Sequence, residues 1–385
     1  MAERPSAVEN LVSASGRGPF GDVFRNRRVL ITGHTGFKGS WLTSWLLELG
    51  ARVSGVACDI PTEPSMFVEL GLERRITHQV LDIRDLPALG ALFRAEQPEF
   101  VFHLAAQPIV SKSYSDPVKT VSTNTIGTMN VLECLRGLRQ RCCAVLVTSD
   151  KCYDNVEWVW GYRETDRLGG KDVYSGSKAA AELIIRCYVH SFFMSPDCPV
   201  RIGIGRAGNV IGGGDWAQDR VVADCVRAWS TGRVVETRSP AATRPWQHVL
   251  EPLSGYLTLA HALARGEAVH GEAFNFGPPA EQSHTVLELL SELARGWGLD
   301  AAAAFRVSAG TGFAEAGLLK LNCDKALHQL AWRPSLAYED SVRYVADWYR
   351  EFYRGERTRI AQLTVRQIDA YSSAARAKGV TWALP

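Results

Sequence analysis

The chain of 385 residues is long enough for roughly two domains, each with its own core. Its 43 Lys and Arg residues nearly balance its 41 Asp and Glu residues, so charge gives no support for binding to nucleic acid or to an anionic membrane. No apolar stretch approaches the ~20 residues that a membrane-spanning helix needs, which excludes a protein built on such helices.

Residues 1–24 contain several Pro and Gly residues but no apolar core of the length that a secretory signal requires. We therefore expect a flexible N-terminal arm there. The nine cysteines are scattered without the spacing of a metal site. Free thiols in a reducing cytoplasm, with no metal bound, are the expected state.

A glycine-rich turn follows the first predicted strand. The apolar run at residues 28–32 stops at Gly33, and further glycines follow at Gly36 and Gly39. Residues 40–49 then carry apolar side chains at helical spacing and are followed by a glycine as a candidate C-cap. Strand, glycine turn and helix in this order predict a pyrophosphate site, because glycine lets the backbone come close and the helix N-terminus offers free N–H groups. A plain tight turn is the alternative.

Strands and helices continue to alternate through the first half. A second strand at residues 51–58 ends at Asp59, twenty residues after Gly39. A carboxylate there can accept hydrogen bonds from an adenosine ribose and would repel a 2′-phosphate, which favours NAD over NADP; a surface aspartate is the alternative. Further strands are expected to end near residues 80–85 and 100–106. The alternation predicts an α/β fold, a Rossmann-like doubly wound parallel sheet with ligands at the carboxyl ends of its strands.

Candidate catalytic side chains follow the next strand. This strand places Thr148, Ser149, Asp150 and Lys151 at the same edge of the sheet, although four polar residues could also form a simple turn. Tyr174 and Lys178, four residues apart, lie on one face of a predicted helix. An ammonium group near a phenol lowers the phenol pKa from its ordinary ~10 and produces a usable base. By itself such a pair is often only a solvated helix face, so the surrounding motifs decide.

The second half of the chain is expected to hold the substrate. Residues 201–216 are rich in glycine, which suits close approach of backbone to a ligand, with a mobile loop as the alternative. Arg220 and Arg244 carry guanidinium groups that could clamp a pyrophosphate, although most single arginines are merely solvated. Helical periodicity at residues 286–297 and 338–352 indicates a smaller α/β substrate domain.

These elements predict a division of the chain. We expect an NAD-binding domain at residues 25–200, to which a later segment near residues 240–275 returns. Residues 201–385 then form mostly the substrate-binding domain.

Together the motifs resemble those of the extended short-chain dehydrogenase/reductases. From about residue 24 onward, the resemblance is closest to the CDP-glucose 4,6-dehydratases of that superfamily. It implies an NAD-dependent lyase that converts CDP-D-glucose to CDP-4-keto-6-deoxy-D-glucose and water, in deoxysugar biosynthesis such as that of lipopolysaccharide O-antigen. The segments that carry the closer resemblance are residues 33–41, 61–65, 148–153, 208–216 and 244–249.

The resemblance also implies roles for single residues. Ser149 hydrogen-bonds the sugar, Asp150 is the acid, and Tyr174 and Lys178 are the catalytic pair. Lys151 replaces the glutamate that is usual in related nucleotide-sugar dehydratases, but the CDP-glucose enzymes share this lysine. The implied cofactor contacts are Gly33, Thr35, Gly36, Phe37, Lys38, Gly39, Asp59, Asp82, Ile83, Leu104, Ala105, Ala106, Gln107, Thr123, Tyr174 and Lys178. The implied substrate contacts are Ser149, Asn209, Arg220, Arg244 and Asn275.

The implied reaction begins when Tyr174 takes the proton of the 4-hydroxyl while the C4 hydride passes to NAD. Lys151 in its neutral form removes the C5 hydrogen, or it instead stabilises the enolate electrostatically and the base is another group; Asp150 protonates the departing C6 hydroxyl. The hydride then returns to C6. Alternatives are a 4-epimerase or GDP-mannose dehydratase of the same superfamily, or a non-catalytic NAD-binding protein. The resemblance further implies a homodimer or higher homo-oligomer that pairs through helices including the one after Tyr174.

Overall fold

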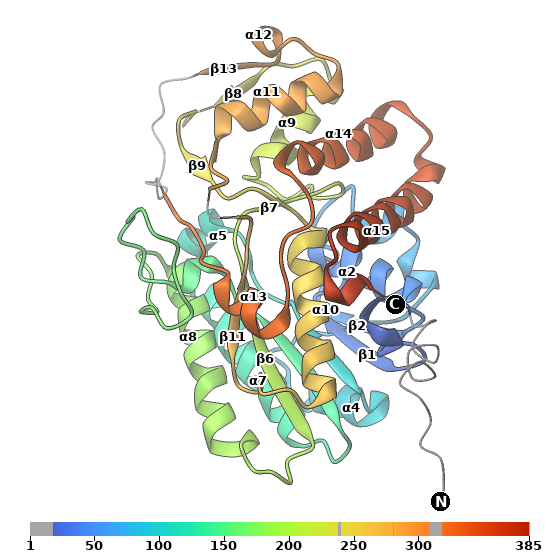
Figure 1. Cartoon of the computed structure of the whole chain (residues 1–385), viewed down its shortest axis with the longest axis vertical. Coiled ribbons are helices and arrows are strands. Elements are labelled where there is room, and N and C mark those ends of the chain that lie inside the picture. The colour runs from blue at the N-terminus through green and yellow to red at the C-terminus, as the bar shows by residue number, and fades with distance from the viewer. Residues whose placement is uncertain (1–17, 238–239, 280, 308–317, 385) are drawn as a thin grey trace, which may run out of the picture.

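The computed structural model describes residues 18–237, 240–279, 281–307 and 318–384. Within these residues the centre is a sheet of seven parallel strands in the order β11-β6-β5-β4-β1-β2-β3 (Figure 1). The chain changes direction across the sheet between β1 and β4, which are neighbours, and a doubly wound sheet opens toward a ligand at such a point. The strands are β1 (Arg28–Thr32), β2 (Arg52–Ala57), β3 (Thr77–Val80), β4 (Phe100–His103), β5 (Cys142–Val147), β6 (Val200–Ala207) and β11 (Ala273–Phe276).

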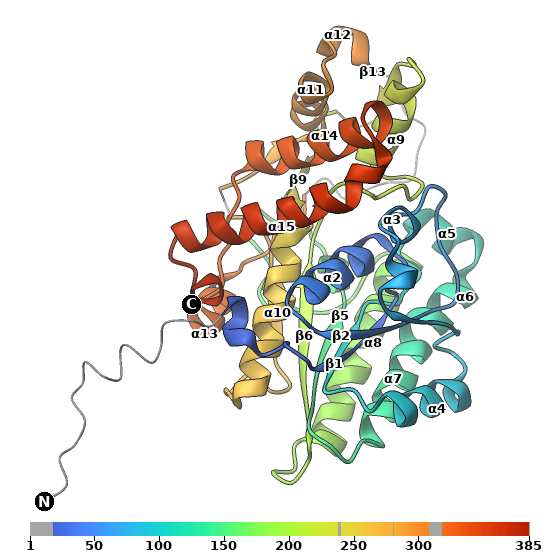
Figure 2. The same cartoon turned by 90° about the vertical axis from the view of Figure 1, so that its right-hand side faces the viewer.

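Helices cover both faces of this sheet, which confirms the predicted doubly wound α/β fold (Figure 2). α4, α7 and α8 pack on one face, while α2 and α10 pack on the other and α15 lies against α2. α2 begins three residues earlier than the sequence pattern predicts, because the helix starts directly from the glycine turn. The bounds are α2 (Phe37–Glu48), α4 (Leu86–Glu96), α7 (Gly127–Arg136), α8 (Val173–Tyr188), α10 (Leu250–Arg265) and α15 (Ile360–Ala377).

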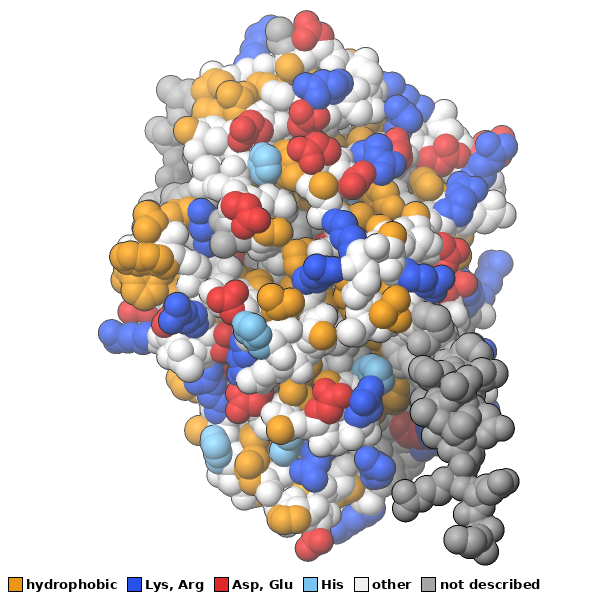
Figure 3. Space-filling view, viewed as in Figure 1, with side chains coloured by type: hydrophobic (Ala, Val, Ile, Leu, Met, Phe, Trp, Pro, Cys, Tyr) orange, Lys and Arg blue, Asp and Glu red, His pale blue; other side chains and the backbone are white. Residues whose placement is uncertain are grey.

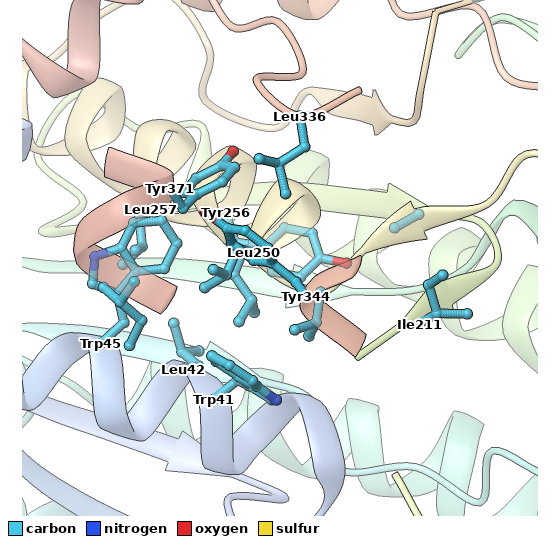
Figure 4. Close-up of a cluster of buried hydrophobic side chains, with 14 of the residues drawn as sticks. Trp41, Leu42, Trp45, Ile211, Leu250, Tyr256, Leu257, Leu336, Tyr344 and Tyr371 are labelled. Atoms are coloured by element: carbon cyan, nitrogen blue, oxygen red, sulfur yellow. The ribbon is translucent and has the colours of Figure 1, made fainter. Parts of the chain in front are cut away.

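Buried aromatic side chains of α2 fix this helix against α10 and α15 (Figure 4). Trp41 and Trp45 are both fully buried, and Trp45 makes an edge contact with Tyr371 of α15 at 5.6 Å between ring centroids. The indole N–H of Trp41 donates to the backbone oxygen of Gly213, 2.9 Å away. Since large aromatic rings bury more apolar area than other side chains, they hold α2 and the turn before it firmly in place.

Residues 18–24 belong to the fold, so the predicted flexible arm is wrong for this part of the chain. The short 3₁₀ turn η1 (Pro19–Asp22) buries Phe20, whose ring stacks on Trp382 at 4.8 Å between centroids. Phe24 is buried against Phe100 of β4. Trp382 lies in η7 (Thr381–Ala383), so the two ends of the described chain cover each other. The earlier part of the predicted arm, residues 1–17, lies outside the described residues.

A smaller group of elements lies beyond the carboxyl edge of the sheet, at the top of Figure 1. Its centre is the packing of α11 against α14, and its short strands pair as β8 with β13 and β9 with β12. The bounds are α9 (Val221–Ser230), β8 (Val235–Thr237), β9 (Thr243–Arg244), β12 (His284–Thr285), α11 (Val286–Trp297), α12 (Ala301–Ala304), β13 (Phe305–Val307), α14 (Tyr338–Arg354) and η6 (Arg357–Arg359).

The chain crosses between the sheet and this smaller group several times. The predicted boundary at residue 200 falls at the start of β6, which stays in the sheet up to Ala207. Later, α10 packs against β5 and β6, and β11 pairs in parallel with β6. α15 packs against α2 although it follows the smaller group. The sheet therefore recruits α10 and β11, in and next to the segment near residues 240–275 that was expected to return, and the helix α15 from still later in the chain.

Among the described residues no helix combines the length and the apolar character that crossing a bilayer requires. Acidic and basic side chains are interspersed over the face shown in Figure 3, in keeping with the near balance of charges.

The short elements that connect the layers are α3 (Met66–Glu69), η2 (Leu72–Arg74), α5 (Val110–Ser115), α6 (Pro117–Val121), η3 (Ser122–Ile126), η4 (Asp150–Cys152), η5 (Val189–Phe193), β7 (Val210–Ile211), β10 (Gln247–His248) and α13 (Asp324–Leu330).

Candidate active site

The turn between β1 and α2 is packed so closely that it requires glycine. Gly33 has a φ of 78°, and a Cβ there would lie 2.7 Å from the backbone nitrogen of Ala105. A Cβ on Gly39 would overlap the carbonyl oxygen of Gly33. Gly36 is the N-cap of α2 and supplies no side-chain cap, so the first N–H groups of the helix point out of the turn without a capping side chain. This arrangement suits an anionic group at the helix N-terminus.

The carboxylates predicted to contact an adenosine lie at the ends of the next two strands. Asp59 is exposed, and its backbone oxygen accepts a hydrogen bond from the Thr35 hydroxyl at 2.7 Å. Asp82 pairs with Arg84 at 2.6 Å, and this bond lowers the pKa of the Asp82 carboxyl. The side chain of Ile83 is buried against α7 and is not open to a ligand.

At the end of β4, Leu104, Ala105 and Ala106 are partly buried beside the glycine turn. The amide side chain of Gln107 is engaged within the protein, since it accepts from the Ile109 N–H and donates to the Ile109 carbonyl and the Thr120 hydroxyl. A predicted cofactor contact through this side chain would have to replace those bonds. Thr123 is half-buried in η3, and the structure leaves its predicted contact untested.

Tyr174 and Lys178 lie one turn apart near the start of α8, as the sequence predicts, and both are buried. Asp172 is the N-cap and accepts from the Ser175 N–H at 2.9 Å, which fixes where the helix begins. Burial lowers the pKa of Lys178 to about 8. Burial also raises the pKa of Tyr174, against the lowering we expected, because desolvation outweighs the Arg220 charge and the Ser149 hydrogen bond.

Asp150 is buried just after β5, and one of its two carboxyl oxygens has no hydrogen-bond partner among the described residues. Its Oδ1 accepts from the Ser149 hydroxyl at 3.0 Å, while Oδ2 has no hydrogen-bond partner among the described residues. A Cβ on Gly208 would lie 2.9 Å from this Oδ2, so the glycine makes room for the carboxyl. Burial raises the pKa of Asp150, and the charge of the adjacent, half-buried Lys151 opposes this shift. The raised pKa increases the fraction of protonated carboxyl, which is the form that can act as a general acid.

Lys38 extends the candidate site from the first turn of α2. Burial and the positive charges of Arg220 and Lys178 lower its pKa to about 8, while Asp150 and Asp215 act in the opposite direction. Arg220 lies at the N-terminus of α9 and donates to the Pro108 carbonyl at 3.3 Å. The glycine turn, the end of β5 and the start of α8 therefore bring these charged side chains close enough to interact.

The remaining predicted substrate residues differ in their placement. Asn209 follows β6 and is half-buried, and Arg244 lies in β9 with its guanidinium donating to the Thr243 carbonyl at 2.9 Å. Asn275 is fully buried in β11, where its amide nitrogen donates to the carbonyls of Tyr162 and Asn322. Its amide oxygen accepts from a tyrosine hydroxyl at 2.8 Å. Because these bonds use both polar atoms of the Asn275 side chain, they leave none for the predicted substrate contact. Asn275 instead links buried segments of the protein.

Two sets of functional candidates escaped the sequence reasoning. Asn124 accepts from the Gln107 N–H at 2.8 Å and donates to the Ser177 hydroxyl at 2.9 Å, so it ties the end of β4 to the first turns of α8. Glu182 and Arg206 form a buried ion pair behind the same helix. Their residue types were the only signal in the sequence, and polar residues in helices and strands are too common for that signal to single them out.

Comparison with known proteins places this site in a family. The family described as GDP-mannose 4,6 dehydratase matches residues 30–345. The chain belongs to this family. A CDP-glucose 4,6-dehydratase of Salmonella typhimurium is 44% identical over 357 residues, which cover 92% of this chain and 98% of the relative. This similarity confirms the resemblance to CDP-glucose 4,6-dehydratases that the motifs indicated.

More distant relatives share the fold. The dTDP-glucose 4,6-dehydratase of Streptomyces antibioticus is 25% identical over 84% of this chain and 92% of its own. A crystal structure of dTDP-glucose 4,6-dehydratase from Streptomyces venezuelae with NAD bound has a TM-score of 0.71 and 23% identity, covering 84% of this chain and 97% of that one. UDP-glucose 4-epimerase from Thermotoga maritima also reaches 0.71, with 22% identity over 84% of this chain and 98% of that one. These likenesses confirm the Rossmann-like fold.

Proposed function

We propose that the protein is an NAD-dependent CDP-glucose 4,6-dehydratase, a lyase that converts CDP-D-glucose to CDP-4-keto-6-deoxy-D-glucose and water. The observation that carries this proposal is the 44% identity, over nearly the whole of both chains, to an enzyme of that name. The buried side chains of Tyr174, Lys178, Ser149 and Asp150 support it, because they supply a base and an acid at the carboxyl edge of the sheet.

The residues of the glycine turn fit NAD as the cofactor. The backbone around Gly33 and Gly39 admits no side chain, and the N-terminus of α2 would hold the pyrophosphate together with the backbone of Phe37 and Lys38. The exposed Asp59 carboxylate would take the adenosine ribose. When bound, NAD accepts a hydride from C4 of the sugar and returns it to C6.

Oxidation at C4 needs a base for the hydroxyl proton, and Tyr174 is our candidate. Its phenolate form is opposed by burial but favoured by the charge of Arg220 and by the Ser149 hydroxyl. Lys178, on the same face of α8, would hold a ribose hydroxyl of the cofactor. Ser149 then both supports Tyr174 and hydrogen-bonds the sugar.

Elimination of water needs an acid at C6 and a base at C5. Asp150 serves as the acid, since burial favours its protonated form and its Oδ2 is available to a leaving hydroxyl. Lys151 in its neutral form is our first candidate for the base at C5. Lys38 is a second candidate, because its lowered pKa of about 8 leaves a useful fraction of neutral amine near neutral pH. Asn209, Arg220 and Arg244 would bind the nucleotide diphosphate of the substrate.

Mass spectrometry of the product from each nucleotide-glucose in turn tests the proposal. CDP-glucose should lose one water, whereas an epimerase would leave the mass unchanged. Deuterium at C4 of the substrate should appear at C6, and hydrogen from solvent at C6 would contradict internal hydride return. Tyr174→Phe should lower kcat at least about 10²-fold while CDP-glucose still binds. Tyr188→Phe, at the far end of the same helix, is the matched control and should keep wild-type kcat.

A homodimer is our proposal for the assembly. Apolar side chains are exposed on α5, α6 and η3, which all contact α8, and on α8 itself. Val118 is 78% exposed and Leu183 is 50% exposed, and contiguous apolar surface of this kind is typical of a protein interface. Val118→Asp should convert a dimer to monomers in analytical ultracentrifugation. A monomeric wild type would contradict the proposal. The exposed apolar residues are Tyr114, Val118, Val121, Ile126 and Leu183.

We also propose that the protein works in the cytoplasm. All nine cysteines are free thiols, including the adjacent pair Cys142 and Cys143. Free thiols persist in a reducing compartment, and nucleotide sugars are the substrates that the proposed activity requires there.

A further inference from the structure

Glu182 and Arg206 form a fully buried ion pair behind the candidate catalytic residues. Glu182 lies on α8 one turn after Lys178, so the two side chains share a face of the helix with Tyr174. Arg206 lies on β6, and both side chains are 0% exposed. The guanidinium donates through two nitrogens, Nη2 to Oε1 and Nε to Oε2 at 2.9 Å. This two-point geometry fixes direction as well as distance.

The carboxylate of Glu182 also holds the stretch that carries the candidate acid. The Thr148 hydroxyl donates to Glu182 Oε2 at 3.0 Å, and the Cys152 thiol approaches the same oxygen at 3.7 Å. Thr148 directly precedes Ser149, and Cys152 directly follows Lys151. Glu182 therefore anchors both ends of this stretch to the helix that carries Tyr174 and Lys178.

Arg206 extends the connection to Tyr153 and to the end of β6. It donates to the hydroxyl of Tyr153, and its guanidinium lies over that ring, 4.7 Å from the centroid. Two residues after Arg206, Gly208 provides the space for Asp150 Oδ2. A displacement of Arg206 would therefore move the end of β6, and with it Gly208 and the Asp150 carboxyl that packs against Gly208.

We propose that Glu182 and Arg206 are positioning residues, which set the distance between the Tyr174–Lys178 pair and the Ser149–Asp150 pair. Neither side chain is open to substrate, because both are enclosed by protein. Stability alone does not account for them, since desolvation of two buried charges offsets most of their attraction and uncharged replacements are often tolerated. This inference rests on the proposed dehydratase function.

Steady-state kinetics of the holoenzyme with CDP-glucose tests the inference with two variants. Arg206→Lys keeps the charge but loses the two-point geometry. The double variant Glu182→Leu/Arg206→Met removes both charges and should fold with a Tm near that of the wild type. In both, kcat should fall about 10²-fold, as expected for a small misplacement of reacting groups, while KM stays within about threefold.

Two control variants separate positioning from stability. Glu133→Gln breaks the surface pair with Arg136 on the neighbouring α7, 2.6 Å long, and should keep wild-type kcat. Leu132→Ala opens the core below the same helix and should lower Tm without lowering kcat of the folded protein. A wild-type kcat in Arg206→Lys or in the double variant would overturn the inference. So would a fall in kcat that follows Tm equally in all four variants. If the wild type itself fails to convert CDP-glucose, the proposed function fails instead.

Discussion

Replacing Gly39 by alanine tests whether the turn after β1 holds the cofactor. The added Cβ would overlap the Gly33 carbonyl oxygen and lie 2.7 Å from the Cα of His34. Both are main-chain atoms, so no side-chain rotation relieves the contact and the turn itself must move. Overpacking of this kind costs about 1–3 kcal/mol. If the displaced turn binds NAD less well by that amount, the Kd rises about 5- to 150-fold.

Isothermal titration calorimetry of NAD into the purified protein measures this change. Gly90→Ala is the matched control, because Gly90 lies inside α4 and the nearest atom to its added Cβ is the flexible end of Arg94, 3.3 Å away. Alanine favours a helix over glycine by about 1 kcal/mol, so this variant should raise Tm slightly and leave the Kd unchanged. Wild-type NAD affinity in Gly39→Ala, or equal weakening in both variants, would refute the reasoning.

Three more substitutions examine other parts of the molecule. Phe20→Ala should lower the free energy of unfolding in urea by about 3–5 kcal/mol, because the ring is fully buried, and no change would exclude residues 18–24 from the core. Asp150→Asn should stop elimination after C4 oxidation, so that bound NADH accumulates with CDP-glucose; normal turnover would contradict its role as acid. Glu251→Gln tests a buried carboxyl whose pKa burial raises from 4.5 to about 7. The native state keeps this proton when the unfolded state has lost it, so roughly 3 kcal/mol of stability is present at low pH and is lost as pH rises through 7. The difference in unfolding free energy between Glu251→Gln and the wild type should therefore shift in favour of the variant between pH 4.5 and 8. A difference that stays constant over this range would disprove the reasoning.

Features encoded by neighbouring residues were predictable from the sequence. The glycine turn at Gly33 and Gly39 and the helix of Tyr174 and Lys178 depend on local spacing, and the structure has both. The doubly wound parallel sheet was predictable because alternating strands and helices admit few arrangements. The boundary at residue 200 failed for a related reason, since β6 and β11 join the sheet through contacts far apart in sequence.

Features that depend on distant partners were not predictable. Phe20 is buried because Trp382 covers it, and no local pattern near residue 20 shows that cover. Asn275 has the residue type of a substrate ligand, but its amide is used by Tyr162 and by two other segments. Glu182 of α8 stands out only when Arg206 of strand β6 is brought against it.

Burial favours the uncharged forms of Asp150, Lys38, Lys178 and Tyr174 in the candidate site. For Asp150 burial raises the pKa toward the protonated form that a departing C6 hydroxyl needs, and for Lys38 it lowers the pKa to about 8, which frees some neutral amine near neutral pH. For Tyr174 the same burial opposes the phenolate that oxidation at C4 requires. The phenolate of Tyr174 is therefore disfavoured, and an ammonium group one turn away does not by itself make this phenol a usable base. Arg220 and Ser149, brought from other parts of the chain, oppose this rise in the phenol pKa, but desolvation outweighs them.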